Sequence, residues 1–335
     1  MASRLDCSHR KEALSSVRGT VMIESIKKSL PSPIVDWVYR KRMKLRIAQE
    51  FAKDFRRYVN KAAYEDKVIP SHMTARAVEV QGTKDYHRVE KGLTLPEPKR
   101  PFGAAVGERL DQALHLVPQD ASLFTYMASA REALSVWNED GTITDSVSPF
   151  PQRSHSLSEA DVRAFFESRH SVRHFDANRP VEPGLLEDAV QLAQSTPSVC
   201  NRQSWHVRFI VDSAKKAAAR SNQNGNAGFG EIPVLAVVTT DSRLFAGPGE
   251  RNQAWIDGGL FAMSLTWALH GLGLATCMLN MSVSNKKADA LRRDLGIGAH
   301  EVIIMQIAIG YAHEQHRVAR SPRRMPTEVS SIVED

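Results

Sequence analysis

Cysteine is scarce in this sequence. Its 335 residues include only Cys7, Cys200 and Cys277, which are far apart and form neither a CxxC pair nor a Cys/His cluster with metal-ligand spacing. This absence argues against a zinc site, so no metal ligand is predicted. A sparse, odd set of cysteines is also more typical of a reducing compartment than of a secreted, disulfide-bonded protein. We therefore expect a cytoplasmic protein.

Long apolar segments and the common nucleotide-binding loops are missing as well. No run approaches the ~18 uninterrupted apolar residues typical of a membrane-spanning helix, and the polar N-terminus lacks the apolar centre of a signal peptide. The glycine-rich stretch 225–230 has neither the GxGxxG pattern of a dinucleotide-binding turn nor the Gly-Lys-Ser/Thr ending of a P-loop. The net charge of the chain is +6, but the sequence contains no DNA- or RNA-binding motif. We therefore expect no nucleic acid as a partner.

The remaining composition is that of a folded protein with a sizeable core, because 42% of the residues are hydrophobic and 24% are charged. A stretch rich in Ser, Thr, Pro and Asp at 141–158 is typical of a linker. It divides the chain into residues 1–150, predicted to be a mainly helical N-terminal extension, and residues 151–335, where helix and strand patterns alternate. This alternation predicts an α+β fold in which helices flank a mixed central sheet.

The clearest helix pattern in the first part covers residues 34–64. Apolar residues recur there at helical spacing, and most of the other positions are basic. A basic amphipathic helix can lie on an anionic membrane as a peripheral contact, or it can pack its apolar face on the core with Lys and Arg in water. The second arrangement is the more common one. The apolar positions are Val38, Leu45, Ile47, Phe51, Phe55, Tyr58 and Val59.

The rest of the first part is less regular. Residues 104–137 predict two helices that are interrupted at Pro118, with Ser122 as the N-cap of the second. The segment 86–93 is polar and precedes a proline-rich stretch. Its His87 and Glu90 suit either an acid/base pair or a structural salt bridge, of which the salt bridge is favoured.

The second part contains several local signals for helices and strands. Ser158 and Asp161 have the spacing of a capping box, and Pro183 suits the first turn of a helix that stops before Pro197. Helices are also expected over 253–270 and from Ser284 to Gly296. Strands are predicted at 206–211, 233–240, 274–279 and 302–309.

Arg169, Ser171 and Arg173 are the first candidates for ligand binding. Two guanidinium groups and a hydroxyl can converge on a phosphate monoester, whose oxygens match the fork of an arginine. The alternative is an exposed helix end, where cations favour the C-terminal dipole. Arg323 and Arg324 form a second basic pair near the C-terminus, which is weak evidence by itself.

The turn-rich segment 197–205 is the second candidate. Pro197 ends a helix, and the amides of Asn201 and Gln203 can donate and accept hydrogen bonds together, as the edge of a heteroaromatic ring requires. Trp205 suits an anchor in the core. An ordinary helix-to-strand loop is the alternative. Cys200 has no evident base partner, so a nucleophilic role is not predicted.

Six segments together resemble the FMN-dependent nitroreductase family over roughly residues 158–330. In chain order they are 168–175, 196–205, Asp257-Gly258-Gly259, 271–280, Ile309-Gly310-Tyr311 and 324–329. The resemblance implies a homodimer that holds FMN non-covalently in a groove between the subunits. The N-terminal extension and the variant of segment 198–203 resemble a subgroup that accompanies surface-polysaccharide genes.

The resemblance also implies roles for individual residues. The phosphate and ribityl chain would be held by Arg169, His170, Ser171 and Arg173, with Arg323 and Arg324 completing the phosphate site. Asn201 and Gln203 would bind the ring or ribityl chain, while Pro197, Ser198 and Val199 would line the cofactor from the partner subunit. The backbone of Met278, Leu279 and Asn280 would pass the ring, with an N–H near the flavin N5.

Two positions depart from the family pattern. Many members have an acidic residue and a glycine where Asn280 and Met281 stand, so the substrate preference is expected to differ. The basic residue that usually precedes the last arginine by two positions falls on Pro322, so it is open whether Arg323 replaces it.

The activity implied by the resemblance is ping-pong reduction of a nitroaromatic, quinone-like or other small oxidised acceptor, with NAD(P)H as the electron donor. No catalytic side chain is implied, because the flavin N5 carries the hydride. One alternative is an FMN-dependent dehydrogenase or oxidase that acts on a biosynthetic, glycan-related intermediate. Another is a binding or scaffold protein with a vestigial flavin site.

Overall fold

The computed structural model describes residues 32–63, 73–151 and 156–334, so Cys7 and the polar N-terminus lie outside the described residues. The chain consists of two compact units, residues 1–56 and 57–335. The larger unit carries the sheet and the cavities described below. None of the helices in the described part of the chain has the length and apolar content that a membrane crossing requires.

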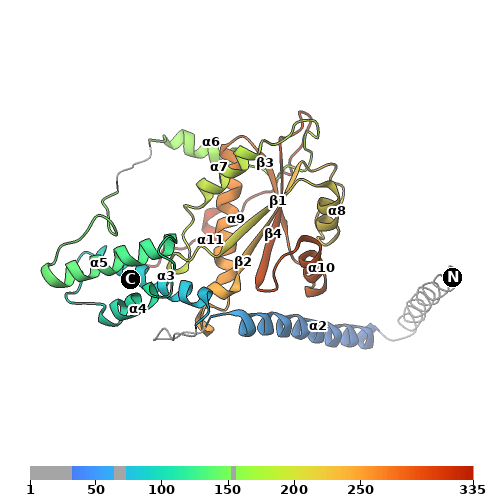
Figure 1. Cartoon of the computed structure of the whole chain (residues 1–335). Helices are drawn as coiled ribbons and strands as arrows, with labels where there is room; N and C mark the ends of the chain where they lie inside the picture. Colours follow the sequence, from blue (N-terminus) through green and yellow to red (C-terminus); the bar gives the residue numbers. More distant parts are fainter. Residues whose placement is uncertain (1–31, 64–72, 152–155, 335) are drawn as a thin grey trace, which may run out of the picture. The chain divides into compact units, whose positions relative to one another are not determined.

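A four-stranded sheet is the centre of the larger unit (Figure 1). Its strands are β1 (Trp205–Ile210), β2 (Val234–Asp241), β3 (Ala275–Asn280) and β4 (Glu301–Gly310), in the order β1-β2-β4-β3. All three pairings are antiparallel, and parallel pairing in the described residues is limited to isolated bridges such as Ser171–Thr276. The sheet is therefore less mixed than the sequence predicts. The apolar runs of β2 and β4 resemble those of parallel strands because helices cover both faces.

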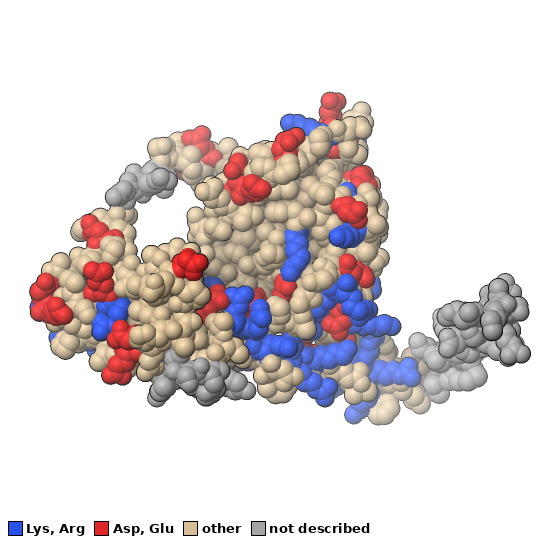
Figure 2. Space-filling model, viewed as in Figure 1, with Lys and Arg blue, Asp and Glu red and all other residues tan. Residues whose placement is uncertain are grey.

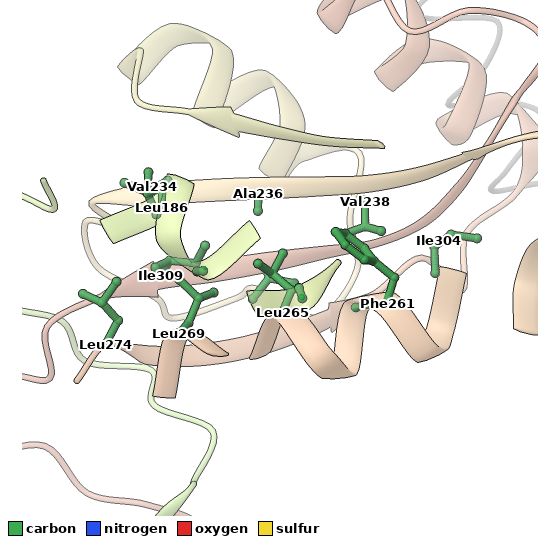
Figure 3. Close-up of a cluster of buried hydrophobic side chains, with 14 of the residues drawn as sticks. Leu186, Val234, Ala236, Val238, Phe261, Leu265, Leu269, Leu274, Ile304 and Ile309 are labelled. Atoms are coloured by element: carbon green, nitrogen blue, oxygen red, sulfur yellow. The ribbon is translucent and has the colours of Figure 1, made fainter. Parts of the chain in front are cut away.

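Alternating side chains of the strands point to the two helical layers. Helices α7 (Pro183–Ala193) and α9 (Gln253–Gly271) cover one face, while α8 (Ser213–Ser221) and α10 (Asn285–Leu295) cover the other. In β2, Val234, Ala236 and Val238 belong to the first core cluster, whereas Leu235 and Val237 belong to the second. Figure 3 shows the first cluster between α9 and the sheet. Burial of each Leu or Phe side chain in this cluster stabilises the folded protein by roughly 1.5–3 kcal/mol.

Gly258 allows α9 to approach the sheet closely. A Cβ atom at this position would lie only 2.7 Å from Cδ1 of Ile304 and 2.9 Å from Cγ2 of Thr240. The next residue, Gly259, has no heavy atom within 4 Å of the same ideal position. The two neighbouring glycines of one helix therefore have opposite packing environments.

Three N-terminal helices pack on one another and form a third core cluster. They are α3 (Ala75–Leu93), α4 (Ala104–Leu114) and α5 (Ser122–Asp140), which confirms a helical N-terminal extension. The fully buried carboxylate of Asp85 accepts two hydrogen bonds from Arg109, at 2.7 and 2.6 Å. The polar segment 86–93 is the C-terminal half of α3. One detail of the prediction is wrong: Ser122 is the first residue of α5 rather than its cap, because Ala121 occupies the N-cap.

Helix α3 also contacts the sheet-bearing part of its unit. It packs against two 3₁₀ turns, η1 (Val199–Asn201) and η2 (Ser242–Leu244).

The domain boundary near residue 150 stays a prediction. The local signals of the second part agree with the structure: Ser158 and Asp161 form the capping box of α6 (Glu159–Ser168), and Pro183 is the first residue of α7.

Helix α2 (Ser32–Lys61) leaves most of its large apolar side chains exposed. Residues 32–56 belong to the smaller unit, so the packing of this face on the core stays a prediction. The last turn belongs to the larger unit, and there the hydroxyl of Tyr58 donates a 2.6 Å hydrogen bond to the carbonyl of Gly247.

Candidate functional site

A cavity of about 600 Å³ brings the predicted phosphate-binding segment together with the C-terminal segment. Helix α6 ends at Ser168, and the chain then runs in extended form beside the start of β3, where the N–H of Val172 donates to the carbonyl of Thr276 at 2.9 Å. Because side chains of extended chain alternate, Val172 enters the core while its neighbours face the cavity. The residues lining the cavity are Phe166, Glu167, Arg169, His170, Ser171, Arg173, Trp267, Ala319, Arg320, Ser321 and Arg323.

The C-terminal segment contributes two arginines to this cavity. Arg323 lines it as predicted and donates a 2.8 Å hydrogen bond to the carbonyl of Ser321. Arg324, which was also predicted, is not among the lining residues. Arg320 takes part instead, and it was missed because two residues of irregular chain separate it from Arg323. The turn at Ser321 has a left-handed φ of 44°, and no sequence pattern indicated it.

The cavity is strongly cationic. Its lining contains four guanidinium groups, from Arg169, Arg173, Arg320 and Arg323, and a single carboxylate, from Glu167. Within the described residues, none of the four arginines forms an ion pair with a carboxylate. Their forked donors therefore remain available to an anion.

Two neighbouring groups are uncharged near neutral pH. Burial lowers the pKa of His270, and the charge of Arg169 lowers it further. Burial raises the pKa of the Cys277 thiol, which lies close to Ser171 and Arg173. Neither group adds a negative charge that would oppose an anionic ligand.

The second predicted segment forms a tight loop around η1. Three of its non-glycine residues have left-handed backbones, with φ of 48° at Cys200, 53° at Asn201 and 46° at Gln203. Such conformations cost roughly 1–2 kcal/mol each for ordinary residues, although Asn tolerates them better. The loop must therefore be held by its surroundings.

Hydrogen bonds from several elements hold this loop. The carboxylate of Asp257 in α9 accepts from the N–H of Val199 at 3.3 Å, and Arg202 pairs with Glu250 at 2.6 Å. Burial raises the pKa of Asp257 in spite of its hydrogen bonds from Gln253 and Val199. The hydroxyl of Ser198 also accepts from the N–H of Gln203 at 2.9 Å.

Helix α3 supplies a further support for the loop. The buried Tyr86 hydrogen-bonds through its hydroxyl to the side chain of Asn201. Burial raises the pKa of Tyr86 to about 12, and the nearby carboxylate of Glu90 adds to this effect, so the phenol stays neutral. Glu90 also pairs with His87 at 3.1 Å, as expected for a structural salt bridge. The link between α3 and the loop was missed, because the sequence shows no relation between positions 86 and 201.

The third predicted segment is the end of β3. This strand lies at the edge of the sheet, so alternate backbone groups point away from β4. The side chain of Leu279 is buried in the core, and that of Asn280 is exposed. The carbonyl of Asn280 accepts a 2.8 Å hydrogen bond from Gln223. Neither this segment nor residues 197–203 contribute to the lining of the cationic cavity, although the Ser171–Thr276 bridge joins that cavity to the same strand.

The sequence of this region matches a family model described as "Nitroreductase family", over residues 166–224 and 210–311. Residues 166–311 are therefore similar to the nitroreductase family. This region, called the nitroreductase domain below, includes the first part of the cationic cavity, the η1 loop and β3. The N-terminal helices and the C-terminal arginines lie outside the matched range.

Curated relatives of the nitroreductase domain are oxidoreductases. An NADH dehydrogenase of Thermus thermophilus is 27% identical over 187 residues, covering 46% of this chain and 88% of the relative. A 4-nitrobenzoate reductase of Pseudomonas putida is 24% identical over 222 residues, covering 51% and 92%. Among solved structures, an FMN-dependent nitroreductase from Clostridium difficile R20291 is 21% identical, with a TM-score of 0.41 over 48% of this chain and 92% of the other.

Proposed function

We propose that this protein is an FMN-dependent oxidoreductase that uses NAD(P)H to reduce a small oxidised acceptor, such as a nitroaromatic or quinone-like compound. The observation that carries the proposal is the cavity with four arginines and one carboxylate, located in the first segment of a nitroreductase-family domain. The name of one relative, NADH dehydrogenase, supports the choice of a nicotinamide donor, and the name of the other, 4-nitrobenzoate reductase, supports a reductase.

The cavity fits the phosphate end of FMN. A phosphate monoester carries a charge close to −2 near neutral pH, and arginine forks bind its oxygens with paired hydrogen bonds. We assign the phosphate to Arg169, Arg173, Arg320 and Arg323, with the hydroxyl of Ser171 as a further donor and His170 beside the ribityl chain. Arg324 is left out of the phosphate site.

The other predicted residues suit the ring end of the cofactor. The amides of Asn201 and Gln203 offer donors and acceptors, and the hydrogen bond that Asn201 donates to the hydroxyl oxygen of Tyr86 fixes the orientation of Asn201. At β3 we assign a backbone role to residues 278–280, because the side chain of Leu279 is committed to the core. When bound, FMN supplies the redox chemistry, taking a hydride from NAD(P)H and passing it to the acceptor. The residues of the chain bind and orient the reactants, and no side-chain acid or base is assigned.

A homodimer would complete this site. Residues 197–203 do not line the cationic cavity of their own chain, and we propose that Pro197, Ser198 and Val199 face the cofactor bound by the partner subunit. Helix α9 offers a surface for such a partner, since Trp255, Ile256 and Leu260 are exposed there. Sedimentation as a monomer with full FMN occupancy would contradict the shared site.

The reductase proposal is tested by purifying the full chain, measuring flavin absorbance, and adding NADH or NADPH without oxygen. We expect loss of the oxidised-flavin absorbance and its return on adding a nitroaromatic or a quinone. A preparation that takes up no FMN would refute the flavin site. A bound flavin that neither nicotinamide reduces would instead favour a dehydrogenase or oxidase with an organic electron donor.

A further inference from the structure

The exposed apolar face of α2 runs along the length of the helix. Positions 34, 37, 41, 45, 48, 52, 55 and 59 follow one another in steps of three or four, all are exposed, and all but Lys41 are apolar. Phe51 lies beside this row and is 70% exposed, while Phe55 and Trp37 are 66% and 61% exposed. Scattered apolar side chains on a surface need no explanation, but a continuous helical stripe indicates a partner.

The same helix carries the positive charge of the protein. Residues 32–61 contain nine Lys or Arg and three Asp or Glu, which gives a net charge of +6. This equals the net charge of the whole chain, so the remaining residues are neutral in sum. Figure 2 shows Lys and Arg side chains along α2. The ammonium of Lys41 lies 5.7 Å from the centre of the Trp37 ring, so even the stripe itself combines a cation with an aromatic group.

These two properties together select the partner. A second copy of the helix would cover the apolar stripe but would bring two charges of +6 together, which is unfavourable. An anionic lipid surface accepts aromatic and aliphatic side chains at the boundary of its acyl chains and attracts Lys and Arg to its headgroups. Long basic side chains can keep their charges at the headgroups while their stems lie along apolar surface.

We propose that α2 binds an anionic phospholipid bilayer, lying in the plane of the surface with Trp37, Phe51 and Phe55 inserted. A helix of this length is about 45 Å long, so the stripe offers an extended contact. The last turn of α2 belongs to the larger unit, so a membrane-bound α2 tethers that unit to the bilayer through the continuous chain. The flavin site has no part in this proposal.

The full-length protein is tested by co-sedimentation with vesicles of phosphatidylcholine alone and of phosphatidylcholine with phosphatidylglycerol. We expect sedimentation only with the anionic vesicles, and its loss as salt is raised. The double variant Phe51→Gln/Phe55→Gln keeps helix propensity and should lower the partition coefficient at least about tenfold. Lys41→Glu/Lys44→Glu should lower it by about tenfold or more.

Matched controls place the same changes elsewhere on the surface. Phe150→Gln removes another exposed phenylalanine, and Lys99→Glu/Lys215→Glu makes the same change in charge after α3 and on α8, so both should bind like the wild type. Equal sedimentation with both kinds of vesicle, or with neither, would overturn the proposal. So would gel filtration in which Phe51→Gln/Phe55→Gln converts a dimer to a monomer, because the stripe would then be a contact between copies.

Discussion

Arg323 and Arg324 offer a sharp test of the cationic cavity, because they are neighbours of the same chemistry in different surroundings. Arg323 lines the cavity and Arg324 does not. Replacing each by alanine removes the same charge and the same side chain. Only the first replacement should remove a hydrogen-bond donor from a phosphate bound in the cavity.

The expected losses of FMN affinity in the two variants differ by more than the experimental error. A hydrogen bond to a charged group is worth about 1.5–3 kcal/mol, so Arg323→Ala should weaken FMN binding by about 10- to 150-fold. Arg324 can act only as a distant charge. At about 10 Å in water its attraction to a charge of −2 is roughly 0.8 kcal/mol, which corresponds to about a fourfold change in affinity.

The assay is titration of flavin-free protein with FMN, followed by the quenching of flavin fluorescence, with riboflavin as a second ligand. Riboflavin lacks the phosphate, so neither substitution should alter its affinity. Equal losses of FMN affinity in the two variants would refute the placement of Arg323. An equal loss for riboflavin would show that the arginine acts on the fold rather than on the phosphate.

Three further outcomes follow from the packing and the charges. Gly258→Ala should lower the free energy of unfolding by roughly 1–3 kcal/mol through overpacking against the sheet, whereas Gly259→Ala should raise it by about 0.5–1 kcal/mol; thermal melts that shift in the same direction would contradict this. Burial raises the pKa of Glu301, but hydrogen bonds outweigh burial and lower it from 4.5 to about 2, so its stabilisation is present above pH 4.5 and is lost as the pH falls toward 2. Urea titrations should therefore show the deficit of Glu301→Gln shrinking by roughly 3 kcal/mol across that window, and a constant deficit would disprove it. Tyr86→Phe should weaken FMN binding by about two- to tenfold through loss of its bond to Asn201, and unchanged titrations would remove Tyr86 from the site.

Much of the fold could be predicted because its signals are local. The apolar runs of β2 and β4 and the capping box of α6 depend on neighbours in the chain. Arg169, Ser171 and Arg173 line one cavity for the same reason, since extended chain projects alternate residues to one side, while their role in binding stays a prediction. The direction of the strands was not predictable, because helices on both faces make antiparallel strands as apolar as parallel ones.

Helix α3 was missed because it buries polar residues. Gln81, Thr83, Lys84 and Asp85 are all buried, and their polar groups obscure the apolar periodicity that would indicate a helix. Ion pairing with Arg109 offsets the cost of burying Asp85, but this partner lies 24 residues further along the chain. The roles of Tyr86 and Arg320 likewise depend on contacts that no local spacing contains.

The contact between α3 and the η1 loop makes the two halves of the chain interdependent. A fragment beginning near residue 151 would contain every segment of the nitroreductase match but would lose Tyr86 and the helix that covers the loop. Its left-handed turns would then be free to relax, so the shortest stretch that resembles a complete family member should be a poorer flavoprotein than the whole chain.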